Sequence, residues 1–240
     1  MKEILSAKAI TKAFDNNLIF KNLDITLMEG ETLALLGPSG IGKTTILNVL
    51  SGIMAPDSGK VYLKGEDITA KPGHISYMQQ KDLLLPYYTV LENVALPLII
   101  KGEKKKEACK KAGELFEFFG ISGYENKFPK EMSGGMRQRA ALLRTFIQSN
   151  GIILLDEPFG ALDAVTRHKM QQWYTEISRE MKMSTIIITH DTDEALILAD
   201  RIIVMKDAEN VHEITLSSKS QNFELTEDFL HKKKEVLSHL

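Results

Sequence analysis

The chain has 240 residues, of which 43% are hydrophobic and 26% are charged, and its formal net charge at pH 7 is −2. This composition is close to the globular average and excludes collagen-like, coiled-coil and intrinsically disordered chains. The balanced charge provides no overall attraction to nucleic acid, and we expect no nucleic-acid partner. The single cysteine, Cys109, cannot form a disulfide within the chain.

We expect a soluble, cytoplasmic protein that reaches a membrane only through a partner. A membrane-spanning helix needs about 20 apolar residues, whereas the best candidate, residues 90–100, is shorter and contains Glu92, Asn93 and Pro97. The N-terminal sequence MKEILSAKAI has no uninterrupted apolar segment, so we predict no signal peptide.

Strand-like apolar runs alternate with helical patterns, which predicts an α/β core with mostly parallel strands. The predicted strands cover residues 4–9, 18–27, 32–36, 60–63, 74–78, 151–156, 185–189 and 201–206. The predicted helices begin near residue 43 and cover residues 104–119, 134–148, 164–181 and 191–199. Residues 83–148 are mostly helical and interrupt the alternation, so we expect a helical subdomain inserted into the α/β core.

A glycine-rich loop follows the predicted strand 32–36. Residues 37–44 read GPSGIGKT and match G-x-x-x-x-G-K-[ST]. Glycines let successive N–H groups turn toward phosphate oxygens, and the helix that follows adds its positive dipole end. Lys43 can contact the β- and γ-phosphates, Thr44 can ligate Mg²⁺, and Thr45 lies close to the α-phosphate. The predicted nucleotide-binding residues of this loop are Gly37, Pro38, Ser39, Gly40, Ile41, Gly42, Lys43, Thr44 and Thr45.

Two carboxylates, Asp156 and Glu157, follow the buried run 152–155. Ligands of open α/β sheets bind at the carboxyl ends of the strands. There Asp156 can hold Mg²⁺, and Glu157 can accept a proton from an attacking water or orient it. Two acids after an apolar run can also be purely structural, but the phosphate loop favours the functional interpretation.

A second glycine motif, SGGMRQR at residues 133–139, opens a predicted helix. A serine hydroxyl, two glycines and a helix N-terminus can form an anion site, although the motif alone is equally a plain helix cap. One phosphate loop covers one face of a nucleotide. A second anion site therefore suggests that another copy of the chain covers the other face.

Over residues 3–206, the order of these motifs resembles the nucleotide-binding subunit of ATP-binding cassette transporters. GPSGIGKTT resembles the Walker A motif, MSGGMRQR the family signature and IILLDEP Walker B, while ALD (161–163) resembles the D-loop. The resemblance implies a single ABC ATPase domain over residues 1–240, with a P-loop NTPase (RecA-like) α/β core. It also implies an N-terminal antiparallel β part and a helical subdomain at about 83–148.

The same resemblance implies roles for single residues. Glu157 and the switch histidine His190 would be catalytic, and His190 would sense or stabilise the γ-phosphate. ATP would lie between two copies of the chain. The facing copy would contribute Ser133, Gly134, Gly135, Gln138 and Asp163. The implied Mg²⁺ ligands are Thr44, Gln80 and Asp156.

Two of the implied positions have alternatives. The family places an aromatic residue that stacks on adenine at Phe14, which could instead be a core side chain. Either Gln79 or Gln80 matches the family glutamine, and Pro86, six residues after Gln80, favours Gln80.

The segments PFGALD (158–163) and LLLPYYTVLENVALPL (83–98) resemble bacterial importer subunits of the nitrate, sulfonate and taurine class. This implies a location at the cytoplasmic face of the membrane. It also implies an integral membrane permease subunit that contacts residues 83–88, and a periplasmic or lipid-anchored substrate-binding protein that acts indirectly. The chain departs from the family at Met132, where leucine is usual, at Thr44, where serine is commoner, and in lacking a proline before Walker B.

Two other functions remain as alternatives. Soluble cassette ATPases of DNA repair or translation usually carry tandem cassettes or long coiled coils, which this sequence lacks. A P-loop kinase for small molecules would explain the phosphate loop but not SGGMRQR, Asp163 or His190.

The tail, residues 207–240, lies outside the strong resemblance. If residues 226–240 form a helix, one broad face carries Phe229, Leu230, Val236, Leu237 and Leu240. That face would pack on the domain's own core or contact a second copy.

Overall fold

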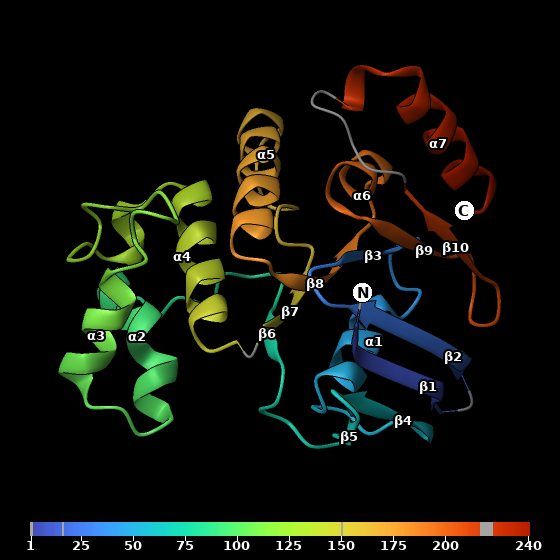
Figure 1. The fold of residues 1–240 in the computed structure, drawn as a ribbon, viewed down its shortest axis with the longest axis horizontal. Helices are drawn as coiled ribbons and strands as arrows, with labels where there is room; N and C mark the ends of the chain where they lie inside the picture. The colour runs from blue at the N-terminus through green and yellow to red at the C-terminus, as the bar shows by residue number, and fades with distance from the viewer. Residues whose placement is uncertain (1, 16, 150, 217–222) are drawn as a thin grey trace.

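The computed structural model describes residues 2–15, 17–149, 151–216 and 223–240, and within them two β-sheets lie side by side with helices around them (Figure 1). The first sheet has the order β2-β1-β4-β5, and its central strand β1 pairs antiparallel with both neighbours. Its strands are β1 (Glu3–Phe14), β2 (Asn17–Met28), β4 (Ser58–Leu63) and β5 (Glu66–Asp67).

The second sheet has the order β10-β9-β3-β8-β7-β6, and all its neighbouring pairs are parallel except β10 with β9. Its strands are β3 (Thr32–Leu36), β6 (Ser76–Met78), β7 (Ile152–Asp156), β8 (Ser184–Thr189), β9 (Arg201–Met205) and β10 (Val211–Thr215). Parallel pairing aligns the carboxyl ends of β3, β7 and β8 at one edge. The phosphate loop, the acidic pair and His190 therefore begin next to one another.

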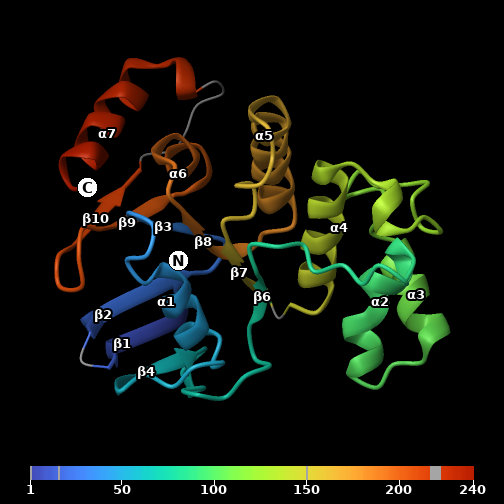
Figure 2. The same ribbon diagram turned by 180° about the vertical axis from the view of Figure 1, so that it is seen from behind.

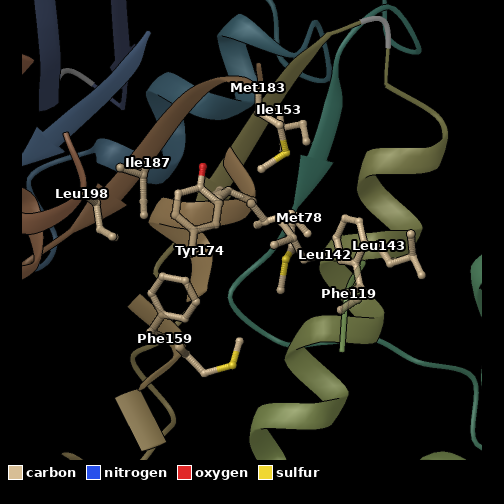
Figure 3. Close-up of a cluster of buried hydrophobic side chains, with 14 of the residues drawn as sticks. Met78, Phe119, Leu142, Leu143, Ile153, Phe159, Tyr174, Met183, Ile187 and Leu198 are labelled. Atoms are coloured by element: carbon tan, nitrogen blue, oxygen red, sulfur yellow. The ribbon is translucent and has the colours of Figure 1, made fainter. Parts of the chain in front are cut away.

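Both faces of the parallel sheet are buried, which explains its continuous apolar runs. Along β3, Ala34 and Leu36 belong to one hydrophobic cluster, whereas Leu33 and Leu35 belong to another. Figure 3 shows part of the first cluster, where Met78 of β6 lies beside Phe119 and Leu142. The predicted α/β fold class is confirmed.

The helices lie in separate groups. α1 (Lys43–Leu50) lies near the antiparallel sheet, whereas α2 (Val90–Ile100), α3 (Lys105–Gly113) and α4 (Gly134–Ile147) gather at the far end of the molecule, with the short helix η1 (Pro129–Glu131) between α3 and α4 in the chain (Figures 1 and 2). α5 (Ala164–Glu180) stands between that group and α6 (Thr192–Leu198). In the part of the chain that the structure describes, no helix is long and apolar enough to cross a membrane.

The tail forms η2 (Phe223–Leu225) and α7 (Glu227–Ser238), and α7 packs on α6. Phe229 and Val236 are buried in the chain's own core and Leu240 packs against it, which favours the first of the two alternatives, whereas Leu230 and Leu237 are exposed. A lysine replaces part of the expected apolar contact, because Lys233 Nζ lies 2.6 Å from Asp193 Oδ1.

The predicted helix 104–119 is also wrong in its second half. α3 ends at Gly113, and turns follow over residues 114–120. Glycine is a poor helix former, and the turns still bury Phe116 and Phe119. The Phe119 ring centroid lies 5.6 Å from that of Phe146 and 5.8 Å from that of Trp173.

Candidate functional site

The phosphate loop joins β3 to α1 and contains two glycines, Gly37 and Gly42, at which neighbouring atoms leave no space for a side chain. Gly42, the N-cap of α1, has a left-handed backbone with φ of 106°, and a Cβ atom there would collide with Ile19. A Cβ atom at Gly37 would lie 2.6 Å from the carbonyl oxygen of Met205. Glycine at these two positions therefore lets the loop pack closely against β2 and β9. Pro38, Ser39 and Gly40 are exposed, and Ile41 and Thr45 are partly buried.

The side chain of Lys43 folds back over this loop. Lys43 is 5% exposed, and its Nζ donates to the carbonyl oxygens of Gly37 at 2.7 Å and Pro38 at 2.8 Å. Burial lowers the pKa of the Lys43 ammonium, while Glu157 and Asp156 oppose this shift in part. Within the described residues, the Lys43 ammonium thus donates its hydrogen bonds to neutral carbonyl groups.

Asp156, at the end of β7, receives two hydroxyl groups. Its Oδ2 accepts from Thr44 Oγ1 at 2.9 Å and from Tyr77 OH at 3.2 Å. Asp156 is 6% exposed, and burial raises the pKa of its carboxyl, with both hydroxyl contacts lowering it in part. Sequence reasoning missed Tyr77, because only the placement of β6 beside β7 brings its phenol to this carboxylate.

A pocket of about 380 Å³ brings together the predicted Mg²⁺ ligands Thr44, Gln80 and Asp156. Tyr77 and Gln79 also line it. Hydroxyl, amide and carboxylate oxygens are hard donors that suit Mg²⁺, which usually takes one or two carboxylates and completes its shell with substrate phosphates and water. Over the described ranges, no group of three or more His, Cys, Asp or Glu side chains could hold a metal alone. The residues therefore fit Mg²⁺ bound together with a nucleotide.

Glu157 is the point at which three segments converge. Its Oε2 accepts from Gln80 Nε2 at 3.0 Å, and its Oε1 lies 3.1 Å from His190 Nδ1. The backbone of Glu157 is left-handed, with φ of 44°, and its N–H donates to the Ile188 carbonyl of β8 at 3.1 Å. Such backbone strain in a non-glycine residue is concentrated at functional sites.

The second glycine motif does not join this cluster. Ser133 is the N-cap of α4, and its Oγ accepts from the Met136 amide at 3.3 Å. Ser133 is exposed and Gly134 partly exposed. Gly135 is buried and lies against Thr166 of α5. α4 and α1 lie on opposite sides of β6 and β7 (Figures 1 and 2).

Gln138 differs from its neighbours in the motif. Its side chain is 5% exposed, and Oε1 has no hydrogen-bond partner within the described residues. The structure therefore does not present Gln138 on the exposed helix start together with Ser133.

Two more predicted residues lie outside the Glu157 cluster. Asp163 is the N-cap of α5 and accepts from the Thr166 amide at 3.1 Å. Hydrogen bonds from the Thr166 side chain and from its amide lower the pKa of Asp163. Phe14, at the end of β1, is 42% exposed, which argues against a core role, and Lys12 Nζ lies 5.4 Å from its ring centroid.

Comparisons with known proteins identify the family of the chain. The model of the family described as ABC transporter matches residues 20–160. The chain is 40% identical over 205 residues to the formylaminopyrimidine import ATP-binding protein of Halalkalibacterium halodurans, covering 85% of this chain and 80% of that protein. It is 40% identical over 214 residues to an aliphatic sulfonates import ATP-binding protein of Shouchella clausii, covering 88% and 82%. A solved dimeric structure of a bacterial ABC transporter cassette is similar with a TM-score of 0.77 and 31% identity, covering 90% of this chain and 100% of that chain.

Proposed function

The chain belongs to the ABC transporter family, and we propose that it is the ATP-binding and ATP-hydrolysing subunit that powers an importer. The observation that carries this proposal is the convergence on Glu157. Its carboxylate stands at the carboxyl edge of the parallel sheet, beside the phosphate loop, with Gln80 and His190 each holding one oxygen.

ATP binding begins with an exchange of partners at Lys43. The Lys43 ammonium leaves the Gly37 and Pro38 carbonyls and contacts the β- and γ-phosphates instead. Charged phosphate oxygens are stronger acceptors than neutral carbonyls, and the N-terminus of α1 adds its dipole. The half-exposed ring of Phe14 stacks on the adenine.

Thr44, Gln80 and Asp156 would hold Mg²⁺ beside the phosphates. The ion would neutralise charge that develops on the phosphate oxygens during phosphoryl transfer. The Thr44 hydroxyl can turn a lone pair toward the ion and give up its bond to Asp156. The Asp156 carboxylate then still accepts one hydrogen bond, from Tyr77 OH to Oδ2.

Glu157 then acts on the attacking water. The water oxygen forms a bond to the γ-phosphorus, the bond from the γ-phosphorus to the β,γ-bridging oxygen breaks, and ADP leaves with that oxygen. Glu157 takes the proton of the water, and His190 Nδ1 and Gln80 Nε2 orient the carboxylate for this task.

The second face of ATP is covered by another copy of the chain. The start of α4 in that copy, with exposed Ser133, partly exposed Gly134 and the buried Gly135 behind them, contacts the γ-phosphate. Asp163 of that copy organises the interface, whereas a role for Gln138 requires its side chain to leave its buried position.

The remaining partners follow from the importer assignment. Exposed apolar side chains gather in the segment after Gln80, at Leu83, Leu85, Tyr87 and Tyr88, and Tyr87 is 90% exposed. This segment would contact an integral membrane permease at the cytoplasmic face of the membrane. A separate substrate-binding protein would act through that permease. Copurification of the chain with an integral membrane subunit distinguishes this role from that of a soluble cassette ATPase.

Lys43→Ala tests the ATPase assignment. The variant should bind ATP more weakly and release no phosphate, since the phosphates lose their ammonium contact. Exposed Lys169 of α5 provides the control Lys169→Ala. A folded Lys43→Ala protein that releases phosphate at the wild-type rate would contradict the proposal, and transfer of phosphate to a small-molecule acceptor would favour a kinase.

A further inference from the structure

Two arginines of α4 hold the loop that follows Gln80. Asp82 and Leu83 lie two and three residues after Gln80, and the chain there passes α4 on its way to α2 (Figure 2). We call the contacts of Arg137 and Arg144 with Asp82 and Leu83 the arginine clasp.

Arg137 joins the loop to the start of α4. Its Nε lies 3.1 Å from Asp82 Oδ2, and its NH1 donates to the Met132 carbonyl at 2.9 Å. Met132 directly precedes Ser133. One rigid guanidinium group therefore bridges the Gln80 loop and the residue next to the predicted γ-phosphate contact.

Arg144 holds the same loop two turns further along α4. Its NH1 donates to the Leu83 carbonyl at 2.8 Å, and its NH2 donates to the Asp82 carbonyl at 2.6 Å. Asp82 Oδ1 also accepts from the Leu84 amide at 3.1 Å, which fixes the loop conformation. The fork geometry of two donors on two successive carbonyls restrains both position and orientation.

We propose that Arg137 and Arg144 are positioning residues, which make the Gln80 loop and the Ser133 end of α4 move as one unit. The inference rests on the proposed function, in which Gln80 faces the chain's own nucleotide and Ser133 faces that of the second copy. A shift of Asp82 must either break charged hydrogen bonds or carry Met132 with it. Binding of ATP by one copy would thereby set the helix start that this copy offers to the other.

Hydrogen exchange of the isolated chain tests this coupling. Samples contain ATP without Mg²⁺. The chain concentration is kept low enough that light scattering gives the monomer mass, because a facing copy would itself protect Ser133 from exchange. Exchange is followed in peptides covering residues 80–85 and 133–138, with and without ATP. The informative amide of the second peptide is that of Met136, which donates to Ser133 Oγ.

In the wild type, ATP should change exchange in both peptides. In Arg137→Ala and Arg144→Ala, the ATP-dependent change over 80–85 should persist. The change over 133–138 should fall by about twofold or more, since twofold is the lower end of the coupling that single residues carry. ATP affinity and the melting temperature are measured for every variant, so that loss of binding or folding is recognised.

Three further variants separate positioning from mere stabilisation. The double variant Asp82→Arg with Arg137→Asp reverses the ion pair, but a carboxylate at position 137 cannot donate to the Met132 carbonyl. It should therefore restore the response over 133–138 only in part. Arg144→Lys keeps the charge but loses the two-donor fork, so it should preserve the ATP response over 133–138 only in part. Lys101→Ala is the matched control, because Lys101 Nζ donates to the Gln148 carbonyl at the other end of α4, and its response should equal that of the wild type.

An unchanged response over 133–138 in both alanine variants would overturn the inference, as would a folded charge-reversal variant that restores nothing. A wild-type chain that binds no ATP would instead contradict the proposed function, and this inference with it.

Discussion

The chain contains two glycine-flanked helix starts, at α1 and at α4, and they are built in opposite ways. α1 begins after Gly42 without a side-chain cap, so its first N–H groups are left for an external acceptor. α4 begins after Ser133, whose own hydroxyl accepts from Met136. Lys43 beside the first start is buried, whereas Ser133 at the second is exposed.

Because the two helix starts differ in this way, one chain holds an incomplete site. The start of α1 has Lys43, Asp156 and Glu157 arranged around it within the same chain, whereas α4 lies on the other side of β6 and β7 (Figure 1). We therefore treat the α1 start as the chain's own half of the ATP site and the α4 start as the half it offers to a second copy.

Glu157→Gln should affect the chain's own half most. The substitution keeps size and hydrogen bonding but removes the basic carboxylate, so phosphate release should fall by about 10²–10⁴-fold. ATP binding should persist, because Lys43 and Asp156 remain. Steady-state phosphate release measures this, with exposed Glu180 supplying the control Glu180→Gln. Wild-type turnover in Glu157→Gln would remove the role assigned to this carboxylate.

Substitutions at Ser133 test the offered half. Ser133→Arg should lower turnover by about 10²-fold, as expected when a facing phosphate is displaced, while ATP binding by the isolated chain stays unchanged. Aspartate caps helices as well as serine does, so Ser133→Asp should preserve α4 but repel the γ-phosphate. If Ser133→Asp retains full ATPase activity, Ser133 is only a helix cap.

The smallest effect concerns stability and its dependence on pH. Burial raises the pKa of Asp156 above its ordinary value of 3.8, so the folded chain holds this proton more tightly than the unfolded chain. The contribution of the carboxyl to stability is present below pH 3.8 and is lost as the pH rises through the folded pKa. In Asp156→Asn, one amide oxygen can still accept from Thr44 and Tyr77, because both bonds end on Oδ2.

Asp156→Asn should therefore melt at a higher temperature than the wild type at pH 7, and the difference should shrink toward pH 3. For a chain of this size, about 1 kcal/mol corresponds to a shift of about 2–4 °C. Asp207→Asn is the contrasting control, because hydrogen bonds from the Asn210 side chain and from the Glu209 and Asn210 amides lower the pKa of Asp207. This variant should melt at a lower temperature than the wild type at pH 7. A lower melting temperature for Asp156→Asn at pH 7 would contradict this account.

The parallel core was predictable because its local and global signals agree. Runs such as TLALL at β3 and IILLD at β7 are buried along their whole length, which a sheet covered on both faces requires. The phosphate loop was predictable because its glycines and Lys43 have a fixed spacing. Strand β10 was not predicted, since VHEIT has one buried residue and pairs only at the sheet edge.

Other features depend on packing that a linear sequence does not encode. Tyr77 reaches Asp156 only because β6 pairs with β7. In the chain, the end of β6 at Met78 and the start of β7 at Ile152 lie 74 positions apart. Gln138 is buried because of how α4 packs against its neighbours, which its place in a polar motif does not reveal. The contacts of the arginine clasp likewise join residues that lie 55 to 62 positions apart.

The central claim, that the two helix starts meet across ATP, is tested most directly by the mass of Glu157→Gln in solution. Without hydrolysis, ATP should remain bound between two copies, and removal of a negative charge should favour the closed pair. Size-exclusion chromatography with light scattering, with and without Mg²⁺-free ATP, should show an ATP-dependent shift to twice the monomer mass, and Ser133→Arg in the same background should abolish it. A Glu157→Gln chain that binds ATP tightly and remains a monomer at every concentration would contradict the claim.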